Sequence, residues 1–273
     1  MYFLARFLVS GLVSFAVLFP AASHSATLYA VRGSSANYRL ISIDTNTLAV
    51  ADIGALGVDF RFGGFAYDPN AAVLYGITGE GFPVGLHSID IGTGVASPIG
   101  PAGTRAPFGL AFDSTNDTLF GTTHRSGGGD LYTIDSTTGT QSLVGSFGVG
   151  IDGLAYDSKN DRLVGMNAGA GDLYEIDRVN GTLSLLFDGA FVNNNGLAYD
   201  SVQNLFWDID TNGNLYSYDP ANAFARTTRL TGLGAGTSAL AFVVPEPVPL
   251  MGPLAMTIFG GLLGFLGFRR LPL

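Results

Sequence analysis

A short phrase recurs five times in this chain, and it constrains the fold more than any other feature. The copies read GGFAYD, GLAFD, GLAYD, GLAYD and ALAFV. Their alanines stand at positions 66, 111, 155, 198 and 241, so successive copies are 45, 44, 43 and 43 residues apart. A period of this length is typical of repeat architectures, in which each unit packs against its neighbours.

Each unit carries further strand-like segments after the repeated phrase. In the third unit these are Leu163–Met166 and Leu173–Asp177, and a looser fourth segment closes each unit, as Gln141–Val144 does in the second. The segments are short, rich in β-branched or aromatic residues, and bounded by Gly, Asn, Asp or Ser, which indicates strands. Four strands per unit at a period of about 44 are typical of β-propeller blades.

The order of the segments predicts how the ring closes. The fifth copy of the phrase, Ser238–Val244, is C-terminal, whereas the first second-strand segment, Leu28–Val31, opens the repeat region. Pairing these two segments within one blade, the first along the chain, gives five complete blades. We therefore predict an all-β fold, a five-bladed propeller over residues 27–244, with four strands per blade and the C-terminal strand closing the first blade.

Composition agrees with this fold and excludes some functions. The chain of 273 residues has 39 glycines and only 13% charged residues, which suits an all-β protein with many tight turns. There is no cysteine, so disulfides and thiolate metal sites are impossible. The net charge of −9 argues against nucleic acid as a partner, because that partner needs basic patches.

Aspartates recur at two places in each unit, and their number invites an interpretation as metal ligands. Asp113 and Asp157 end the repeated phrase, and Asp135 and Asp177 end the third segment. An Asp that opens a turn accepts hydrogen bonds from backbone N–H groups two or three residues on, while a later Gly or Asn takes the positive φ. The periodic placement favours this structural role.

Residues 1–26 read as a secretory signal. Arg6 precedes an apolar run from Phe7 to Phe19, and small residues follow up to Ala26. The alternative, a transmembrane anchor, needs roughly 20 apolar residues, and this run is shorter. We therefore expect a signal helix at the N-terminus, and export of the chain.

Residues 245–273 change character. Pro245, Glu246 and Pro247 interrupt any strand, and residues 248–268 then contain no charged side chain, which is long enough for a transmembrane helix. Arg269 and Arg270 follow, and by the positive-inside rule they place that end in the cytoplasm.

The order of motif, apolar span and terminal arginine pair resembles the PEP-CTERM sorting signal. The resemblance covers about 29 residues, a tenth of the chain. It implies an exosortase-type processing enzyme as partner, which would recognise Pro245, Glu246 and Pro247. It also implies a Gram-negative host that makes exopolysaccharide. The chain would be anchored in the inner membrane in transit and then reach the cell surface or extracellular matrix. The alternative is an ordinary single-span tail anchor.

Propellers bind ligands at one mouth of the central channel, where loops lead into the innermost strands. In this chain the segments before the repeated phrase differ from unit to unit. Carboxylate, amide and guanidinium groups there suit a sugar or a hydrated cation. The polar candidates are Asp152, Asn193, Asn194, Asn195, Arg61 and Arg105.

Motifs for catalysis are missing from the sequence. His87 lies in a third segment, where we expect a strand residue facing the sheet edge, and His124 precedes a glycine-rich loop without the context of a phosphate site. We predict a non-enzymatic binding or structural module with no cofactor and with exopolysaccharide as a candidate ligand. The alternative is a Ca²⁺-dependent propeller hydrolase or lactonase with its site at the channel mouth.

Overall fold

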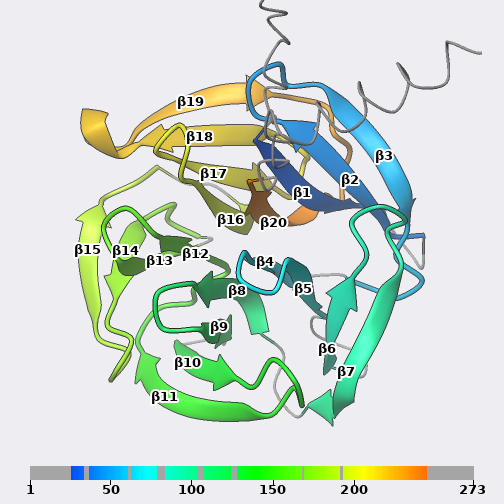
Figure 1. The fold of residues 1–273 in the computed structure, drawn as a ribbon. Helices are drawn as coiled ribbons and strands as arrows, with labels where there is room; N and C mark the ends of the chain where they lie inside the picture. Colours follow the sequence, from blue (N-terminus) through cyan, green and yellow to red (C-terminus); the bar gives the residue numbers. More distant parts are fainter. Residues whose placement is uncertain are drawn as a thin grey trace, which may run out of the picture.

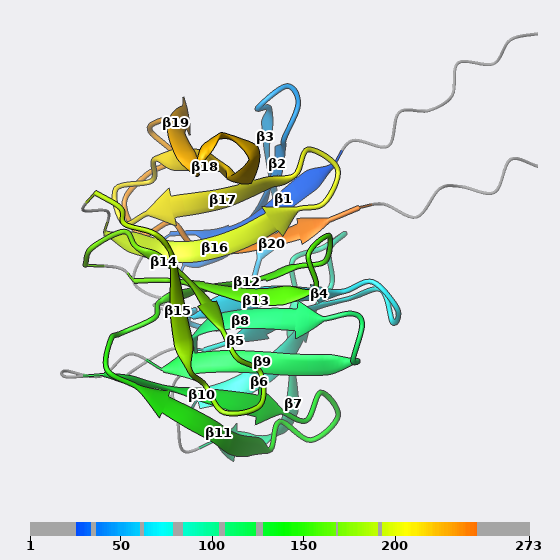
Figure 2. The same ribbon diagram turned by 90° about the vertical axis from the view of Figure 1, so that its left-hand side faces the viewer.

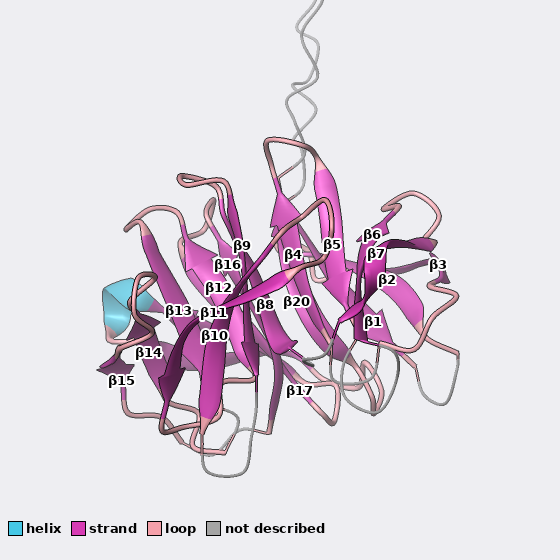
Figure 3. Ribbon diagram, turned by 90° about the horizontal axis from the view of Figure 1, so that it is seen from below, coloured by secondary structure: helices cyan, strands magenta, loops and turns pink. Residues whose placement is uncertain are grey.

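The computed structural model describes residues 26–33, 37–60, 63–78, 84–103, 107–123, 128–167, 169–190 and 193–244. The predicted signal helix and the whole segment 245–273, with its predicted transmembrane helix, lie outside these residues. Within the described ranges no helix has the length and apolarity that crossing a membrane requires. The described part is built almost wholly of strands, and the 3-10 turn η1 (Pro220–Asn222) is its only helical element (Figure 3).

Twenty strands form five four-stranded antiparallel sheets arranged as a ring, so the predicted five-bladed propeller is confirmed (Figure 1). Blade 1 contains β4 (Gly64–Asp68), β5 (Val73–Ile77), β6 (Val84–Ile89) and β7 (Ala96–Gly103). Blade 2 contains β8 (Pro107–Asp113), β9 (Thr118–Thr123), β10 (Gly129–Ile134) and β11 (Gln141–Phe147). Blade 3 contains β12 (Gly153–Asp157), β13 (Arg162–Met166), β14 (Leu173–Ile176) and β15 (Leu183–Phe187). Blade 4 contains β16 (Asn194–Asp200), β17 (Leu205–Asp210), β18 (Leu215–Asp219) and β19 (Ala225–Leu230).

Blade 5 joins the two ends of the chain, as the order of the segments predicts. Its strands are β20 (Ser238–Val243), β1 (Thr27–Arg32), β2 (Arg39–Asp44) and β3 (Val50–Ala55), and β20 is the innermost. β20 pairs antiparallel with β1, so that Thr27 lies opposite Val243. Because β20 supplies the innermost strand of this blade, all five blades have four strands and the ring is closed.

The antiparallel order gives the ring two different faces. The turn face carries the hairpin turns that follow the innermost strands, and the loop face carries the segments that lead into those strands. Since Thr27 pairs with Val243, β1 begins and β20 ends at the same face, the turn face, as Figure 2 shows. Both terminal segments of the chain therefore join the propeller at the turn face.

The glycine that opens the repeated phrase has a steric reason. A Cβ at Gly64 would lie 2.7 Å from the backbone N of Leu110 in the next blade, and one at Gly196 would lie 2.9 Å from the backbone N of Leu240. The innermost strands of neighbouring blades thus approach each other backbone to backbone at the centre of the ring. Ala239 takes this place in blade 5.

We expect Gly64→Val to destabilise the fold by about 1–3 kcal/mol or more, because the backbone atoms that the new side chain meets cannot rotate away. Denaturant unfolding of residues 27–244 would measure the loss. Gly148→Val is the matched control, since a Cβ there meets no atom within 4 Å. Equal stability of the two variants would contradict the close approach of the inner strands.

A second recurring feature explains how the blades are packed against one another. The second strands carry Gly76 in blade 1 and Gly165 in blade 3, and a buried side chain from the segment ahead of the innermost strand lies over each: Phe60 over Gly76 and Ile151 over Gly165. In blade 4 the same strand position holds Trp207, which is fully buried. The indole itself brings a large apolar side chain to the position that glycine occupies in blades 1 and 3.

His87 is buried rather than facing the sheet edge as expected. Only 7% of it is exposed, its ring packs edge-on against Phe60 with centroids 5.6 Å apart, and Nδ1 lies 3.0 Å from the carbonyl O of Gly85. The difference arises because Phe60, which precedes β4, covers this part of the third strand. Burial lowers the pKa of His87, and the hydrogen bond to the Gly85 carbonyl only partly opposes this.

This burial predicts a pH dependence of stability. Because the folded pKa is below the usual value near 6.5, the unfolded chain binds the proton first as pH falls. The stability contribution is therefore complete above about pH 6.5 and is lost progressively below it, by at most about 1.4 kcal/mol per pH unit. Unfolding free energies at about pH 7.5 and 5.5 should differ more in the wild type than in His87→Phe. A difference of the same size in both proteins would contradict this account.

Candidate functional site

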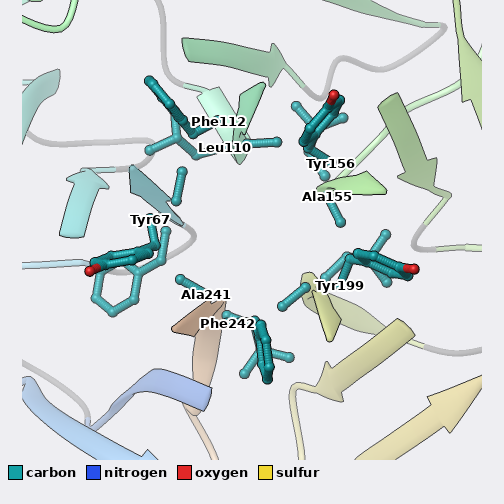
Figure 4. A pocket seen from close by; sticks show the side chains of 15 residues that line it. Tyr67, Leu110, Phe112, Ala155, Tyr156, Tyr199, Ala241 and Phe242 are labelled. Carbon is teal, nitrogen blue, oxygen red and sulfur yellow. The ribbon is translucent and has the colours of Figure 1, made fainter. Parts of the chain in front are cut away.

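The centre of the ring is nearly closed. The innermost strands line a cavity of about 60 Å³, with the small alanine side chains toward the axis and the aromatic rings around it (Figure 4). Such a space holds a few water molecules and nothing larger. Ligands therefore have access to the mouths of the channel rather than to its interior.

At the turn face the channel opens into a hollow that we call the turn-face socket. Its volume is about 120 Å³. Its wall comes from one position of the repeated phrase, which is aromatic in all five blades, and its rim comes mainly from the residues that follow. The lining residues are Tyr67, Phe112, Tyr156, Tyr199 and Phe242 in the wall, with Pro69, Ser114, Ser158, Ser201 and Val244 at the rim.

Hydrogen bonds to the neighbouring turns hold two of these rings in place. The Tyr156 hydroxyl lies 2.6 Å from Thr115 Oγ1 of blade 2 and donates to Asp161 Oδ1 at 2.7 Å. Tyr199 donates to Asn204 Oδ1 at 2.7 Å. Burial, together with the bond to Asp161, raises the pKa of Tyr156 to about 12, so the phenol stays protonated. These hydrogen bonds fix the orientation of the two rings in the socket wall.

The aspartates that end the strands are turn residues, as their periodic placement predicts. Asp113, which is fully buried, accepts backbone hydrogen bonds from Thr115 at 3.0 Å and Asn116 at 3.1 Å. Equivalent pairs of backbone bonds are accepted by Asp44, Asp68, Asp90, Asp135, Asp157, Asp177 and Asp200. The positive φ falls on Gly94, Gly139, Gly181 and Asn204, but also on Leu48, Ala72, Asp117 and Asp161.

Several charged side chains on the turn face form ion pairs with one another. Arg178 of blade 3 bonds the buried Asp113 of blade 2 and, at 2.9 Å, Asp161 Oδ1. Arg162 Nε lies 2.8 Å from Asp157 Oδ2. Lys159, the chain's only lysine, is exposed in the same turn, and among the described residues its ammonium makes no ion pair.

At the loop face the structure places Asp152 and Asn193 in the segments ahead of β12 and β16, in the neighbouring blades 3 and 4. Asp152 is partly exposed, and its N–H donates to the Met166 carbonyl at 3.1 Å. Asn193 is exposed, and its Nδ2 donates to Thr211 Oγ1 at 2.8 Å. Both residues thus lie at the loop face.

The other four polar candidates lie wholly or partly outside the described residues. Asn194 and Asn195 begin β16, and their side chains are not among the described ones; Arg61 and Arg105 lie outside the described residues altogether. Their membership of a site stays a prediction.

The structure adds loop-face residues that sequence reasoning missed. Asp210 accepts from the N–H groups of Asn212 at 2.9 Å and Asn214 at 2.8 Å, from Asn214 Nδ2 at 2.8 Å and from the Tyr216 hydroxyl at 3.2 Å. This network lies beside Asn193, because the Thr211 N–H donates to the Asn193 carbonyl at 3.0 Å. The sequence carried a signal, since β17 ends in Asp208-Ile209-Asp210, whereas no other second strand contains an acidic residue near its end.

The described residues contain no cluster of side chains that could bind a metal ion. No three His, Asp or Glu side chains gather there as a cation would need. Hard cations such as Ca²⁺ take six to eight oxygen ligands. The calcium-dependent alternative therefore gains no ligand set from the described residues.

Comparison with solved structures agrees with the architecture. A chain of a nidogen/laminin complex matches with a TM-score of 0.56 and 12% identity, covering 81% of this chain and 99% of that one. A protein of unknown function from Bacteroides thetaiotaomicron matches with a TM-score of 0.51 and 15% identity, covering 76% of this chain and 58% of that one. No protein-family model and no curated protein sequence matches. At these identities the likeness establishes the propeller fold alone.

Proposed function

We propose that this chain is an exported, non-enzymatic binding propeller of the cell surface or extracellular matrix, with exopolysaccharide as its ligand at the loop face. The observation that carries the proposal is a difference between blades 3 and 4 at the loop face. In blade 3 the segment ahead of β12 contains the buried Ile151, which covers Gly165. In blade 4 the fully buried Trp207 stands at the strand position of Gly165, and Asn193, in the segment ahead of β16, is exposed.

The chemistry of this region suits sugar hydroxyls. Asn193 is exposed and stands beside Thr211, and the carboxylate of Asp152 belongs to the next blade. An amide both donates to and accepts from hydroxyl groups, and a carboxylate accepts from them. The chain's net charge of −9 favours a neutral polysaccharide over an acidic one.

Delivery to the outside is supported by the two ends of the sequence. The signal-like segment 1–26 would send the propeller across the membrane first. Pro245, Glu246 and Pro247 with the basic pair at 269–270 would then direct processing by an exosortase-type enzyme. Because β20 ends at the turn face, a tail in the membrane would leave the loop face turned outward.

Binding of purified residues 27–244 to a glycan array that includes the host's own exopolysaccharide tests the proposal. We expect saturable binding that Asp152→Ala or Asn193→Ala weakens about five- to tenfold each, as the loss of one hydrogen bond would. Asn70→Ala, an exposed amide at the turn face, is the matched control and should bind like the wild type. A folded domain that binds no glycan would contradict the proposal.

A further inference from the structure

The turn-face socket lies where the tail leaves the propeller. Val244 is itself a rim residue of the socket and remains 44% exposed. The next residue is Pro245, and the segment continues as Glu246-Pro247-Val248. Since a chain advances at most about 3.5 Å per residue, Pro245 and Pro247 stay within roughly 10 Å of the rim. Such a short tether gives an effective concentration on the order of millimolar or more.

The socket and this segment match in size and character. A dry cavity of about 150 Å³ accommodates a benzene molecule. The socket of about 120 Å³ therefore suits a proline ring rather than a complete sugar residue. Aromatic-lined hollows are the usual receptors of proline-rich segments, whose stiff backbone loses little entropy on docking. The serine hydroxyls at the rim, from Ser114, Ser158 and Ser201, can donate to the carbonyl groups of such a segment.

Charge gives a second, independent match. Lys159 follows the rim residue Ser158, whereas the equivalent turns of blades 1, 2 and 4 have Asn70, Thr115 and Val202 at this place. Its acidic neighbours Asp157 and Asp161 are already bound by Arg162 and Arg178. The cation is thus available to a carboxylate from the tail, and Glu246 is the only acidic residue there.

We propose that the segment Pro245–Pro247 docks in the turn-face socket, with a proline ring against the aromatic wall and the Glu246 carboxylate paired with Lys159. Docking would cover the segment that the proposed processing enzyme must recognise, so the segment would be accessible only in its undocked state. The contact itself depends neither on glycan binding nor on processing.

Carbodiimide cross-linking of the full chain in lipid nanodiscs tests the docking. The reagent activates a carboxylate and leaves as a urea when a nearby amine forms the amide, so it joins only groups that touch. Because Lys159 is the chain's only lysine and Glu246 the only acidic residue of the tail, a lysine cross-link to the tail identifies both partners, and we expect the Lys159–Glu246 peptide by mass spectrometry. The peptide should be lost in Glu246→Gln.

A doubly substituted chain, Pro245→Gly with Pro247→Gly, separates docking from chance encounters of a tethered tail. Both positions lie outside the propeller, so the change cannot unfold it. We expect the cross-link yield to fall about fivefold, because two glycines allow the free tail many more conformations. An unchanged yield in this variant would overturn the proposal, and so would a folded wild-type chain without the Lys159–Glu246 peptide.

Discussion

Trp207→Ala should cost about 3–5 kcal/mol of unfolding free energy, the range for removing a buried aromatic side chain. The indole is fully buried at the junction of blades 4 and 5. Its neighbours in that cluster include Leu28, Ile41 and Leu240, which belong to the strands that close the ring. The guanidinium of Arg229 lies over the ring, 5.5 Å from its centroid.

Denaturant unfolding of residues 27–244 measures this loss. Val202→Ala, in the same blade and 64% exposed, is the control and should stay within about 0.5 kcal/mol of the wild type. A Trp207→Ala variant that loses less than about 1 kcal/mol would contradict the role of the indole in holding blades 4 and 5 together.

Ending the chain after Gly236 should have a still larger effect, namely loss of cooperative folding. The truncation removes β20, with the buried Leu240 and Val243, and leaves the inner edge of β1 unpaired. It also removes one of the five inner strands whose backbones pack against each other around the channel. We expect a product that aggregates through the open edge and shows no single unfolding transition.

A circular permutant supplies the control for this truncation. Because Thr27 lies opposite Val243, a short linker can join residues 244 and 27, and new ends can be opened in the exposed turn between β10 and β11. All twenty strands are then kept, so the permutant should unfold cooperatively. If the truncated chain folds as well as the permutant does, the closing pair is not what holds the ring together.

Most of this fold follows from periodicity alone. The five blades and their four strands follow from the repeated phrase and its spacing, because the same local pattern occurs five times. The closing pair follows from the start of the repeat at Leu28, which lacks its own innermost strand. The turn role of Asp113 and its equivalents is predictable for the same reason. A sequence pattern that repeats five times therefore leaves few alternative topologies.

What the sequence could not give depends on contacts between distant segments. The burial of His87 requires Phe60 to fold over it, and the duty of Trp207 is visible only beside Phe60 and Ile151 in the other blades. A tryptophan among glycines at one strand position was a usable signal. The socket was missed because each aromatic residue of the phrase looks like an ordinary strand residue until five of them form a ring.

Hydrogen–deuterium exchange of residues 27–244, with and without the host's exopolysaccharide, tests the central claim of a ligand site at the loop face most directly. The account predicts slower exchange in the segments ahead of β12 and β16, at residues 148–152 and 190–195, and in the turn at 211–214. The hairpin turns of the opposite face should be unchanged. Protection confined to those hairpin turns, or none at a saturating concentration of the polysaccharide, would contradict the claim.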